Sequence, residues 1–308
     1  MNKWISAARP RTLPLAASGI ILGGIPDEGQ NWNSSGFLWA LITGLLLQIL
    51  SNFANDYGDF KNGADQFRTS GPSRAVQSGA ISQSQMKLAI ALLAVITLGV
   101  GTFLIYSQLI LLGRMSDFWM MLGIGVLAIV AAYTYTAGPR PYGYMGLGDV
   151  SVFIFFGLVG VLGTHFVLYD ELSSRNFFAA LFVGSMSVAV LHLNNMRDMD
   201  DDAKALKHTL ALRLGWIGSK RYLFALFITA FISIGLWILE GNNFMHWSAM
   251  LPMIILATRW NDIAMENHPE KFDPYLKRFA LTCFFAVFLF SADLLMFSNV
   301  FCRFLLFF

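Results

Sequence analysis

The sequence predicts an all-α fold, in which a single domain (1–308) forms a bundle of membrane-spanning helices. Three observations carry this prediction: the composition, the spacing of apolar runs and the placement of basic residues. Of the 308 residues, 56% are hydrophobic and 13% are charged, and the mean hydropathy is +0.58. Soluble domains are about one quarter charged. Half that charge in a chain of this length favours an integral membrane protein.

Nine apolar runs approach the roughly 20 residues that a helix needs to cross a bilayer. The first and eighth runs are the weakest, because the first is short and carries Pro14 and Pro26, while the eighth carries His246 and Pro252. Neighbouring helices in a bundle can satisfy the backbone groups that such breaks release. The predicted spans cover residues 12–28, 36–55, 88–106, 118–137, 149–169, 176–195, 222–239, 247–264 and 279–300.

The basic residues give an independent test of this count. With nine spans and a cytoplasmic N-terminus, the other side of the membrane carries only Arg114, Arg175 and Arg303 of the 21 Lys and Arg residues. Excess Lys and Arg in cytoplasmic segments is the usual determinant of orientation. The sequence therefore predicts about nine transmembrane helices with the N-terminus in the cytoplasm. The net charge of +2 gives no indication of nucleic-acid binding.

Two acidic blocks follow the second and sixth spans, so both lie at the cytoplasmic face. In the first, Asn55 and Asp59 are four residues apart and share a helix face, with Asp56 beside them; in the second, Asp198 and Asp202 have the same spacing. Massed carboxylates need a cation, and oxygen ligands without His or Cys suit Mg²⁺. We therefore predict Mg²⁺ as the cofactor, with Asp56, Asp59, Asp198 and Asp202 as its ligands.

Basic residues follow each block: Arg68 and Arg74 after the first, Lys204 and Lys207 after the second. Arginine binds phosphate through its forked guanidinium and lysine as a point charge, so these four residues are candidates for a diphosphate. Acidic loop residues are often only solvated or cap helix ends. Two blocks on the same side, with equal spacing and trailing cations, favour a shared site instead. A diphosphate at the mouth of an apolar bundle predicts an amphiphilic substrate in contact with membrane lipid, such as a polyisoprenyl diphosphate.

These blocks resemble the motifs of the UbiA superfamily of intramembrane prenyltransferases. Residues 55–59 match its first motif, N-D-x-x-D, although Asp65 follows Asp59 by six residues where the family has four, which leaves the role of Asp65 open. Residues 198–202 match the second motif, D-x-x-x-D. Within the superfamily, residues 8–14 (A-R-P-R-T-L-P), 133–149 and 194–215 resemble the 1,4-dihydroxy-2-naphthoate polyprenyltransferase branch.

The resemblance implies nine helices around a central cavity, dependence on Mg²⁺, and a location in the cell (inner) membrane with the active site facing the cytoplasm. It implies transfer of a polyprenyl group from the diphosphate to 1,4-dihydroxy-2-naphthoate with loss of CO₂, which gives a demethylmenaquinone in menaquinone biosynthesis. It further implies that Arg140 and Tyr135 help to shape the aromatic pocket. The residues that it implies for catalysis are Asn55, Asp59 and Asp198.

Two alternatives remain at this point. A related enzyme could use another acceptor, such as 4-hydroxybenzoate, homogentisate or haem; the residues at 8–14 and 194–215 argue against it. An ion-coupled transporter would place acidic residues in mid-span, whereas these clusters lie at the ends of the predicted helices. The sequence leaves prenyl chain length and oligomeric state open.

Overall fold

The computed structural model describes every residue except 1, 28–29, 68, 70–73, 241–243 and 298–308. The described residues form helices joined by short loops, and none of them lies in a strand, so the predicted all-α class is confirmed. Among them, seven helical segments are long and apolar enough to cross a membrane. These are α3 (Ser34–Lys61), α4 with η3 (Gln83–Leu112), α5 (Met115–Thr134), α6 to α7 (Gly148–Tyr169), α8 (Ser174–Arg197), α10 (Leu210–Glu240) and the main part of η7 with α13 (Pro269–Ala292).

The first and eighth predicted spans fall on shorter helices. Helix α2 (Leu13–Gly23) has 11 residues and carries Pro14 in its first turn. Helix α11 (Met250–Thr258) has nine residues, and Arg259 separates it from α12 (Trp260–Met265). At 1.5 Å per residue, neither alone covers a hydrocarbon core of about 30 Å. The total of nine spans therefore stays a prediction.

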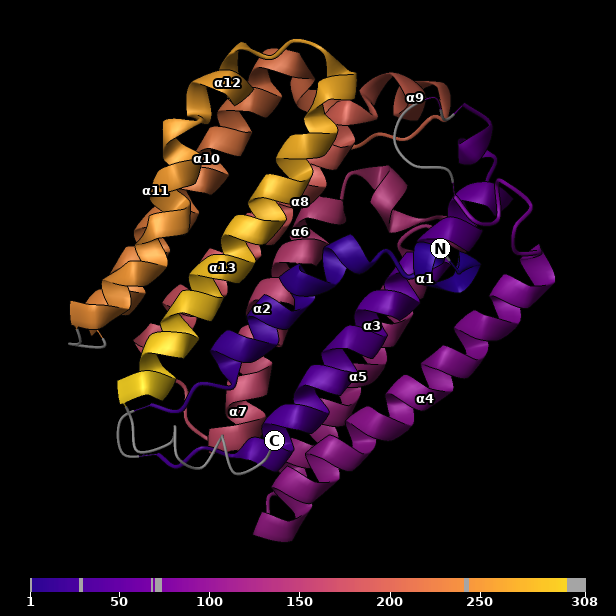
Figure 1. Cartoon of the computed structure of the whole chain (residues 1–308). Coiled ribbons are helices and arrows are strands. Elements are labelled where there is room, and N and C mark those ends of the chain that lie inside the picture. The colour runs from indigo at the N-terminus through magenta and orange to yellow at the C-terminus, as the bar shows by residue number, and fades with distance from the viewer. Residues whose placement is uncertain (1, 28–29, 68, 70–73, 241–243, 298–308) are drawn as a thin grey trace.

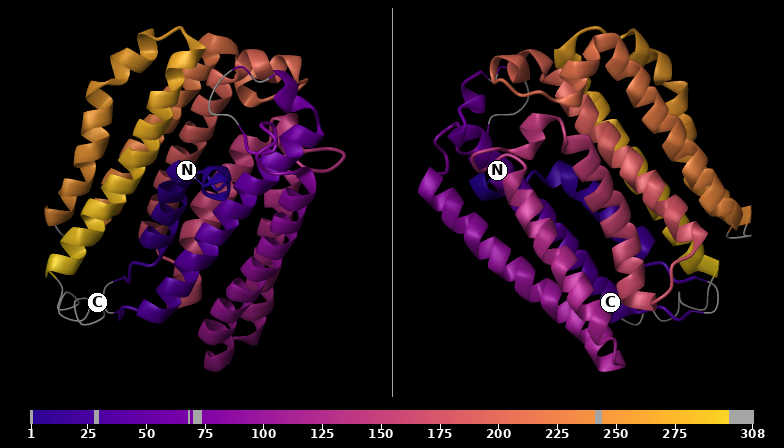
Figure 2. Two further views of the ribbon diagram at one scale, coloured as in Figure 1. Left: turned by 45° about the vertical axis from the view of Figure 1, so that its right-hand side comes forward. Right: turned by 180° about the vertical axis from the view of Figure 1, so that it is seen from behind.

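The helices form two groups (Figures 1 and 2). Helices α3, α4 and α5 pack against one another on one side, and α8, α10, α11 and α13 pack together on the other. Helix α2 lies between the groups, in contact with α3, α13 and the π-helix η5 (Phe153–Gly163), which continues α6 (Gly148–Val152) into α7 (Thr164–Tyr169). This arrangement leaves the site between the two groups.

The outward faces of the helices are apolar, as a lipid environment requires. On α4, Leu92 and Val95 are 56% and 70% exposed, and on α5 Leu127 is 62% exposed. Exposed apolar patches of this extent are unusual on soluble monomers. Helix α8 is the most enclosed of the seven long segments. The pattern identifies a multi-pass membrane protein with its polar residues gathered at the helix ends and around the interior.

The segment after α5 lies directly against the end of α3 because α3 carries a glycine there. A Cβ built on Gly58 would lie 2.5 Å from the carbonyl carbon of Thr136, which no real Cβ tolerates. The Thr136 hydroxyl donates to the Ala54 carbonyl at 3.1 Å, and the Asn62 side-chain amide donates to the Thr136 carbonyl at 2.7 Å. This contact brings Tyr135 to the same end of the bundle as the first acidic block.

Replacing Gly58 by alanine is expected to push the 135–145 segment away from α3. Overpacking of this kind costs about 1–3 kcal/mol, so Gly58→Ala should lower the thermal midpoint of the detergent-solubilised protein. The matched control is Gly99→Ala on the exposed face of α4, where a Cβ meets nothing within 4 Å; its midpoint should stay unchanged or rise, because alanine favours a helix over glycine. Equal midpoints for the two variants would contradict the close approach.

Candidate active site

A cavity of about 420 Å³ opens between the two helix groups and ends at the acidic blocks. Its apolar walls come from α2, α3, α5, η5 and α8, and α13 contributes near the mouth. The cavity thus combines a polar end with a long apolar interior. The polar residues at its mouth that sequence analysis predicted are Asn55, Asp59, Arg74, Asp198, Asp202 and Lys207.

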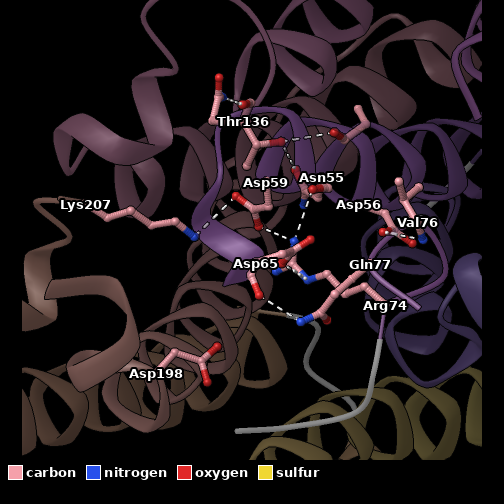
Figure 3. A network of polar contacts seen from close by, with 12 residues as sticks. Asn55, Asp56, Asp59, Asp65, Arg74, Val76, Gln77, Thr136, Asp198 and Lys207 are labelled. Atoms are coloured by element: carbon pink, nitrogen blue, oxygen red, sulfur yellow. Dashed lines mark hydrogen bonds and ion pairs between the residues drawn. The ribbon is translucent and has the colours of Figure 1, made fainter. Parts of the chain in front are cut away.

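Asp59, in the last turn of α3, is the centre of this mouth (Figure 3). It is only 3% exposed. Its carboxylate is paired with Arg74, lies 3.2 Å from Nζ of Lys207, and accepts a hydrogen bond of 2.6 Å from the Tyr144 hydroxyl. Two cations and a phenol therefore converge on one carboxylate.

Lys207 joins the two acidic blocks. Its Nζ lies 3.2 Å from Oδ1 of Asp59 and 3.3 Å from Oδ1 of Asp202, and it sits 4.8 Å from the centre of the Tyr144 ring. A second connection supports it, because Asp201 accepts bonds from the backbone N–H and the hydroxyl of Thr69, at 2.8 and 3.0 Å. Segments about 140 residues apart in the sequence thus meet at one end of the bundle.

Arg74 is held by two acidic residues of the first block. Besides Asp59, its Nε lies 3.4 Å from Asp65, and it donates to the Asn55 carbonyl at 3.1 Å. Burial alone would lower the pKa of Arg74, but the charges of Asp59 and Asp65 outweigh that effect and raise it. Asp65, whose role the shifted spacing left open, thus lies in contact with this guanidinium.

Asp56 has a different environment from Asp59. Its carboxylate accepts hydrogen bonds from the backbone N–H groups of Ala75 and Val76, at 3.0 and 3.3 Å, and it is not part of the cavity wall. These bonds hold the loop that carries Arg74. The structure thus shows Asp56 in contact with this loop and outside the cavity wall, and its predicted role as a metal ligand stays a prediction.

The second block presents two carboxylates to the cavity. Asp198 accepts two hydrogen bonds from Arg197, at 2.7 and 2.8 Å, and Arg197 in turn reaches Asp273 at the start of α13. Asp202 lies in α9 (Met199–Lys204). Burial, reinforced by the charges of Asp198 and Asp59 and opposed by Lys207, raises the pKa of Asp202 to about 6. A pKa of about 6 means that this carboxyl changes its protonation state in mildly acidic solution.

The remaining predicted residues differ in whether the structure places them at the cavity. Tyr135 lines the cavity, where its ring meets Tyr142 edge to face at 5.4 Å. Lys204 and Arg140 are exposed and belong to no wall of the cavity. Arg68 lies outside the described residues. The roles predicted for these residues stay predictions.

Several residues at the site were not singled out by sequence analysis. Tyr144 stands in a segment of several tyrosines, and only the fold shows which hydroxyl reaches Asp59; burial and that carboxylate raise its pKa, so the phenol keeps its proton. Arg9, Arg11 and Lys277 also line the mouth of the cavity. The A-R-P-R motif was the available signal for the two arginines, whereas Lys277 had none.

A second buried polar pair lies behind the cavity wall. Nδ1 of His192 on α8 is 3.6 Å from Oδ2 of Asp149 at the start of α6, and the two side chains are 0% and 4–5% exposed. The His192 ring also meets the Tyr222 ring of α10 edge to face at 4.8 Å. The pair ties α6, α8 and α10 together next to the segment that carries Tyr135.

The donor set fits a magnesium ion that shares its ligands with a substrate. Among the described residues, no three His, Cys, Asp or Glu side chains lie close enough to form a complete metal cage. Mg²⁺ typically takes one or two carboxylates and completes its octahedron with water and phosphate oxygens. The ammonium of Lys207 already places one positive charge between Asp59 and Asp202, so this spot favours cations. A diphosphate would supply the oxygens that the chain does not.

A helical membrane bundle with carboxylates and basic side chains gathered at the mouth of an apolar cavity is typical of an intramembrane prenyltransferase. The model of the UbiA prenyltransferase family matches residues 13–289, and the chain belongs to this family.

Curated relatives resemble almost the whole chain. The 1,4-dihydroxy-2-naphthoate octaprenyltransferase of Haemophilus influenzae (strain ATCC 51907 / DSM 11121 / KW20 / Rd) is 38% identical over 299 residues, 96% of each chain. The enzyme of the same name from Escherichia coli (strain K12) is 37% identical over 281 residues, 89% of each.

Solved structures share the fold at low identity. A UbiA homolog from Aeropyrum pernix K1, in its apo form, has a TM-score of 0.69 at 14% identity, covering 94% of this chain and 98% of its own. A UbiA homolog from Archaeoglobus fulgidus, bound to GPP and Mg²⁺, has a TM-score of 0.62 at 14% identity, covering 94% and 99%.

Removing the Lys207 charge is expected to destabilise the ligand-free protein. Lys207→Gln leaves Asp59 and Asp202 facing each other without a shared cation, and the loss of a charged hydrogen-bond partner costs about 1–3 kcal/mol. The thermal midpoint should fall in Lys207→Gln and stay unchanged in Lys204→Gln, since Lys204 is exposed. A Lys207→Gln midpoint equal to that of the control would show that the bridge contributes nothing.

Proposed function

We propose that the protein transfers a polyprenyl group from an allylic polyprenyl diphosphate to 1,4-dihydroxy-2-naphthoate, with decarboxylation, to give the hydroquinone form of demethylmenaquinone. The observation that carries the proposal is the convergence of the two acidic blocks and their cations at the mouth of one apolar cavity. The named relatives, similar over 89–96% of the chain, favour this acceptor over 4-hydroxybenzoate.

The diphosphate is proposed to bind at the mouth, between the first and second blocks. Arg74 and Lys207 provide the positive charges, and Tyr144 provides a neutral donor. Asp59, Asp198 and Asp202, with the amide oxygen of Asn55, would hold Mg²⁺. The bound ion would supply electrophilic stabilisation of the diphosphate oxygens. Asp56 is assigned to holding the Arg74 loop, because its carboxylate accepts two backbone N–H groups of that loop and does not line the cavity.

The chain's own groups favour departure of the diphosphate. When the allylic C–O bond breaks, the electron pair stays on oxygen, and donors aimed at that growing charge lower the barrier. Asp59 holds Arg74 and Lys207 at the cavity mouth in the ligand-free protein, and these two cations would turn to the diphosphate when Mg²⁺ takes their place on the Asp59 carboxylate. The allylic cation left behind faces Tyr135, Phe155 and Phe156 on the cavity wall, whose aromatic faces stabilise cations.

The acceptor is proposed to bind beside these rings. Its nucleophilic ring carbon forms the new C–C bond with the prenyl carbon, and CO₂ leaves from that same ring carbon, which restores the aromatic ring. The carboxylate of the acceptor needs a cation on the way in. Arg9, Arg11 and Lys277 at the cavity mouth provide positive charge of this kind.

Orientation follows from the distribution of basic residues. The mouth lies at the end of the bundle that carries most of the Lys and Arg residues, which the positive-inside rule assigns to the cytoplasm. We therefore propose an enzyme of the cell (inner) membrane with its active site facing the cytoplasm, where a soluble naphthoate can enter while the prenyl tail stays in lipid.

The direct test is an assay of purified protein with a labelled polyprenyl diphosphate and each acceptor in turn. The hydroquinone form of demethylmenaquinone, CO₂ and diphosphate should form from 1,4-dihydroxy-2-naphthoate in the presence of Mg²⁺, and EDTA should abolish the activity; air then oxidises the hydroquinone to demethylmenaquinone for detection. Prenylated 4-hydroxybenzoate without any naphthoquinone product would contradict the proposed acceptor. Product formation that persists in EDTA would contradict the metal.

Substitutions within the acidic blocks should show that carboxylates lining the cavity matter for kcat and that an exposed carboxylate does not. Asp59→Asn and Asp198→Asn are expected to lower kcat by about 10²–10³-fold, the usual effect of losing an electrostatic group at the reacting centre. Asp200→Asn is the matched control, because Asp200 belongs to the second block but is exposed. Activity near wild type in Asp59→Asn or Asp198→Asn would remove that residue from the site.

The raised pKa of Asp202 predicts a pH dependence of metal binding. Below about pH 6 the Asp202 carboxyl is protonated and neutral, so it does not attract a cation. Above that pH it is a negatively charged carboxylate that can bind one. The apparent affinity for Mg²⁺ with a prenyl diphosphate should therefore rise with pH through about 6. The diphosphate of the substrate also changes its protonation state with pH, and it does so with either protein. The quantity to compare is therefore the difference in apparent Mg²⁺ affinity between wild type and Asp202→Asn at each pH. Identical profiles would contradict the assignment.

A further inference from the structure

The buried pair formed by Asp149 and His192 takes no part in the diphosphate site. Its side chains lie behind the cavity wall, and Nδ1 of His192 is 3.6 Å from Oδ2 of Asp149. Within the described part of the chain, both oxygens of Asp149 and both ring nitrogens of His192 lack a partner at hydrogen-bond distance. Ionisable groups inside membrane segments are costly, and they often mark functional sites. Buried polar atoms without partners also call for such an explanation.

Tyr135 connects this pair to the cavity. Its ring lines the cavity wall. Its hydroxyl lies against the start of α6, where a Cβ built on Gly148 would come within 2.7 Å of the hydroxyl oxygen. Of the carboxylates around this hydroxyl, Asp149 exerts the strongest electrostatic effect, ahead of Asp59 and Asp202. The Tyr135 hydroxyl therefore lies between the substrate space and a buried carboxylate.

The other titratable groups that face the pair are phenols. Tyr222 of α10 meets the His192 ring edge to face at 4.8 Å and interacts with Asp149. Tyr142 packs against the Tyr135 ring, and its hydroxyl donates to the Ala131 carbonyl at 2.9 Å. Among the described residues, no lysine or arginine lies within ion-pair distance of Asp149. A proton that reaches this carboxylate is therefore shared with an imidazole and is not repelled by a fixed positive charge.

We propose that the Tyr135 hydroxyl carries a proton from a hydroxyl of the acceptor to the Asp149–His192 pair and later returns it. The inference rests on the proposed function, because it assumes a dihydroxynaphthoate in the cavity beside Tyr135. Tyr135 is then a catalytic residue, since it contacts the acceptor. Asp149 and His192 act through Tyr135 and are positioning residues that also store the proton.

This proton transfer fits each bond change of the proposed reaction. The naphthol O–H next to the carboxyl-bearing carbon gives its proton to the Tyr135 oxygen, while the Tyr135 proton moves to Asp149. The resulting naphtholate raises the electron density on the carbon that attacks the prenyl cation. The new C–C bond turns the naphtholate oxygen into a ketone, β to the carboxylate. When CO₂ leaves, the electron pair of the broken bond restores the aromatic ring as a naphtholate, which takes the proton back, so no proton is consumed.

The experiment measures kcat against pH for Asp149→Asn, which keeps the shape of the side chain and removes its basicity. The range is about pH 7–9, above the titration of Asp202 at about 6 and below the ionisation of a phenol at about 10. General-base transfer contributes about 10²–10⁴-fold, so kcat at the lower end should fall at least about 100-fold. The ratio of variant to wild-type kcat should then rise about tenfold per pH unit, because water takes the acceptor proton instead.

The matched control is a second buried imidazole–carboxylate pair, at the other end of the helical segment that contains Asp149. Nε2 of His165 on α7 lies 3.6 Å from Oδ2 of Asp27, and neither residue belongs to the cavity wall. His192→Gln should reproduce part of the pH-dependent loss. His165→Gln should keep the wild-type pH profile even where its thermal midpoint falls. Identical profiles for these two variants would remove His192 from the proton path.

A further variant keeps the proposal testable if Asp149→Asn does not fold. Tyr135→Phe removes only the hydroxyl and retains the ring on the cavity wall, so it should show the same loss and the same rise with pH. A folded variant with wild-type kcat, or with an equal loss at every pH, would overturn the relay, since a structural role does not shift the pH dependence. A wild-type protein that transfers no prenyl group to 1,4-dihydroxy-2-naphthoate would refute the proposed function, and the relay with it.

Discussion

The site depends on the ammonium of Lys207 lying between the carboxylates of Asp59 and Asp202, at 3.2 and 3.3 Å. Those two carboxylates come from helices in opposite halves of the chain, and without a cation between them they would repel across a poorly hydrated space. The same contacts that stabilise the bundle end form the proposed site for a diphosphate and its metal ion. Stability and the proposed activity therefore rest on one set of contacts.

The membrane imposes the second constraint, because polar groups must gather where water or substrate can satisfy them. Helix α3 meets this constraint because its middle is apolar and its end is polar. At that end, Asn52 donates a hydrogen bond of 2.8 Å to the Ala8 carbonyl and so anchors the N-terminal segment. Asn55 and Asp59 face the cavity. The apolar residues earlier on the same face of α3 line the inner part of the cavity. One helix thus carries both the head and the tail part of the proposed substrate site.

Much of this could be predicted from the sequence because it depends on periodicity. Apolar runs gave the class of fold, and the i,i+4 spacing at Asp59 and Asp198 identified carboxylates that line one cavity. The parts that could not be predicted depend on loop backbone: Asp56 is engaged by two N–H groups of the loop at 75–76, and Asp65 holds Arg74. From their spacing along α3, Asp56 and Asp59 are equally good candidates for metal ligands. Only the path of the loop shows that Asp56 contacts backbone N–H groups whereas Asp59 lines the cavity.

The central claim is that the two blocks hold one common ligand, and a double-mutant cycle measures this directly. Binding of a non-hydrolysable prenyl diphosphate analogue with Mg²⁺ would be compared among wild type, Asp59→Asn, Asp202→Asn and the double variant. Groups that share a ligand couple, with interaction energies of about 0.5–3 kcal/mol. The double variant is therefore expected to bind scarcely worse than the weaker single variant. Strictly additive losses would show that Asp59 and Asp202 act at separate places, and the account would fail.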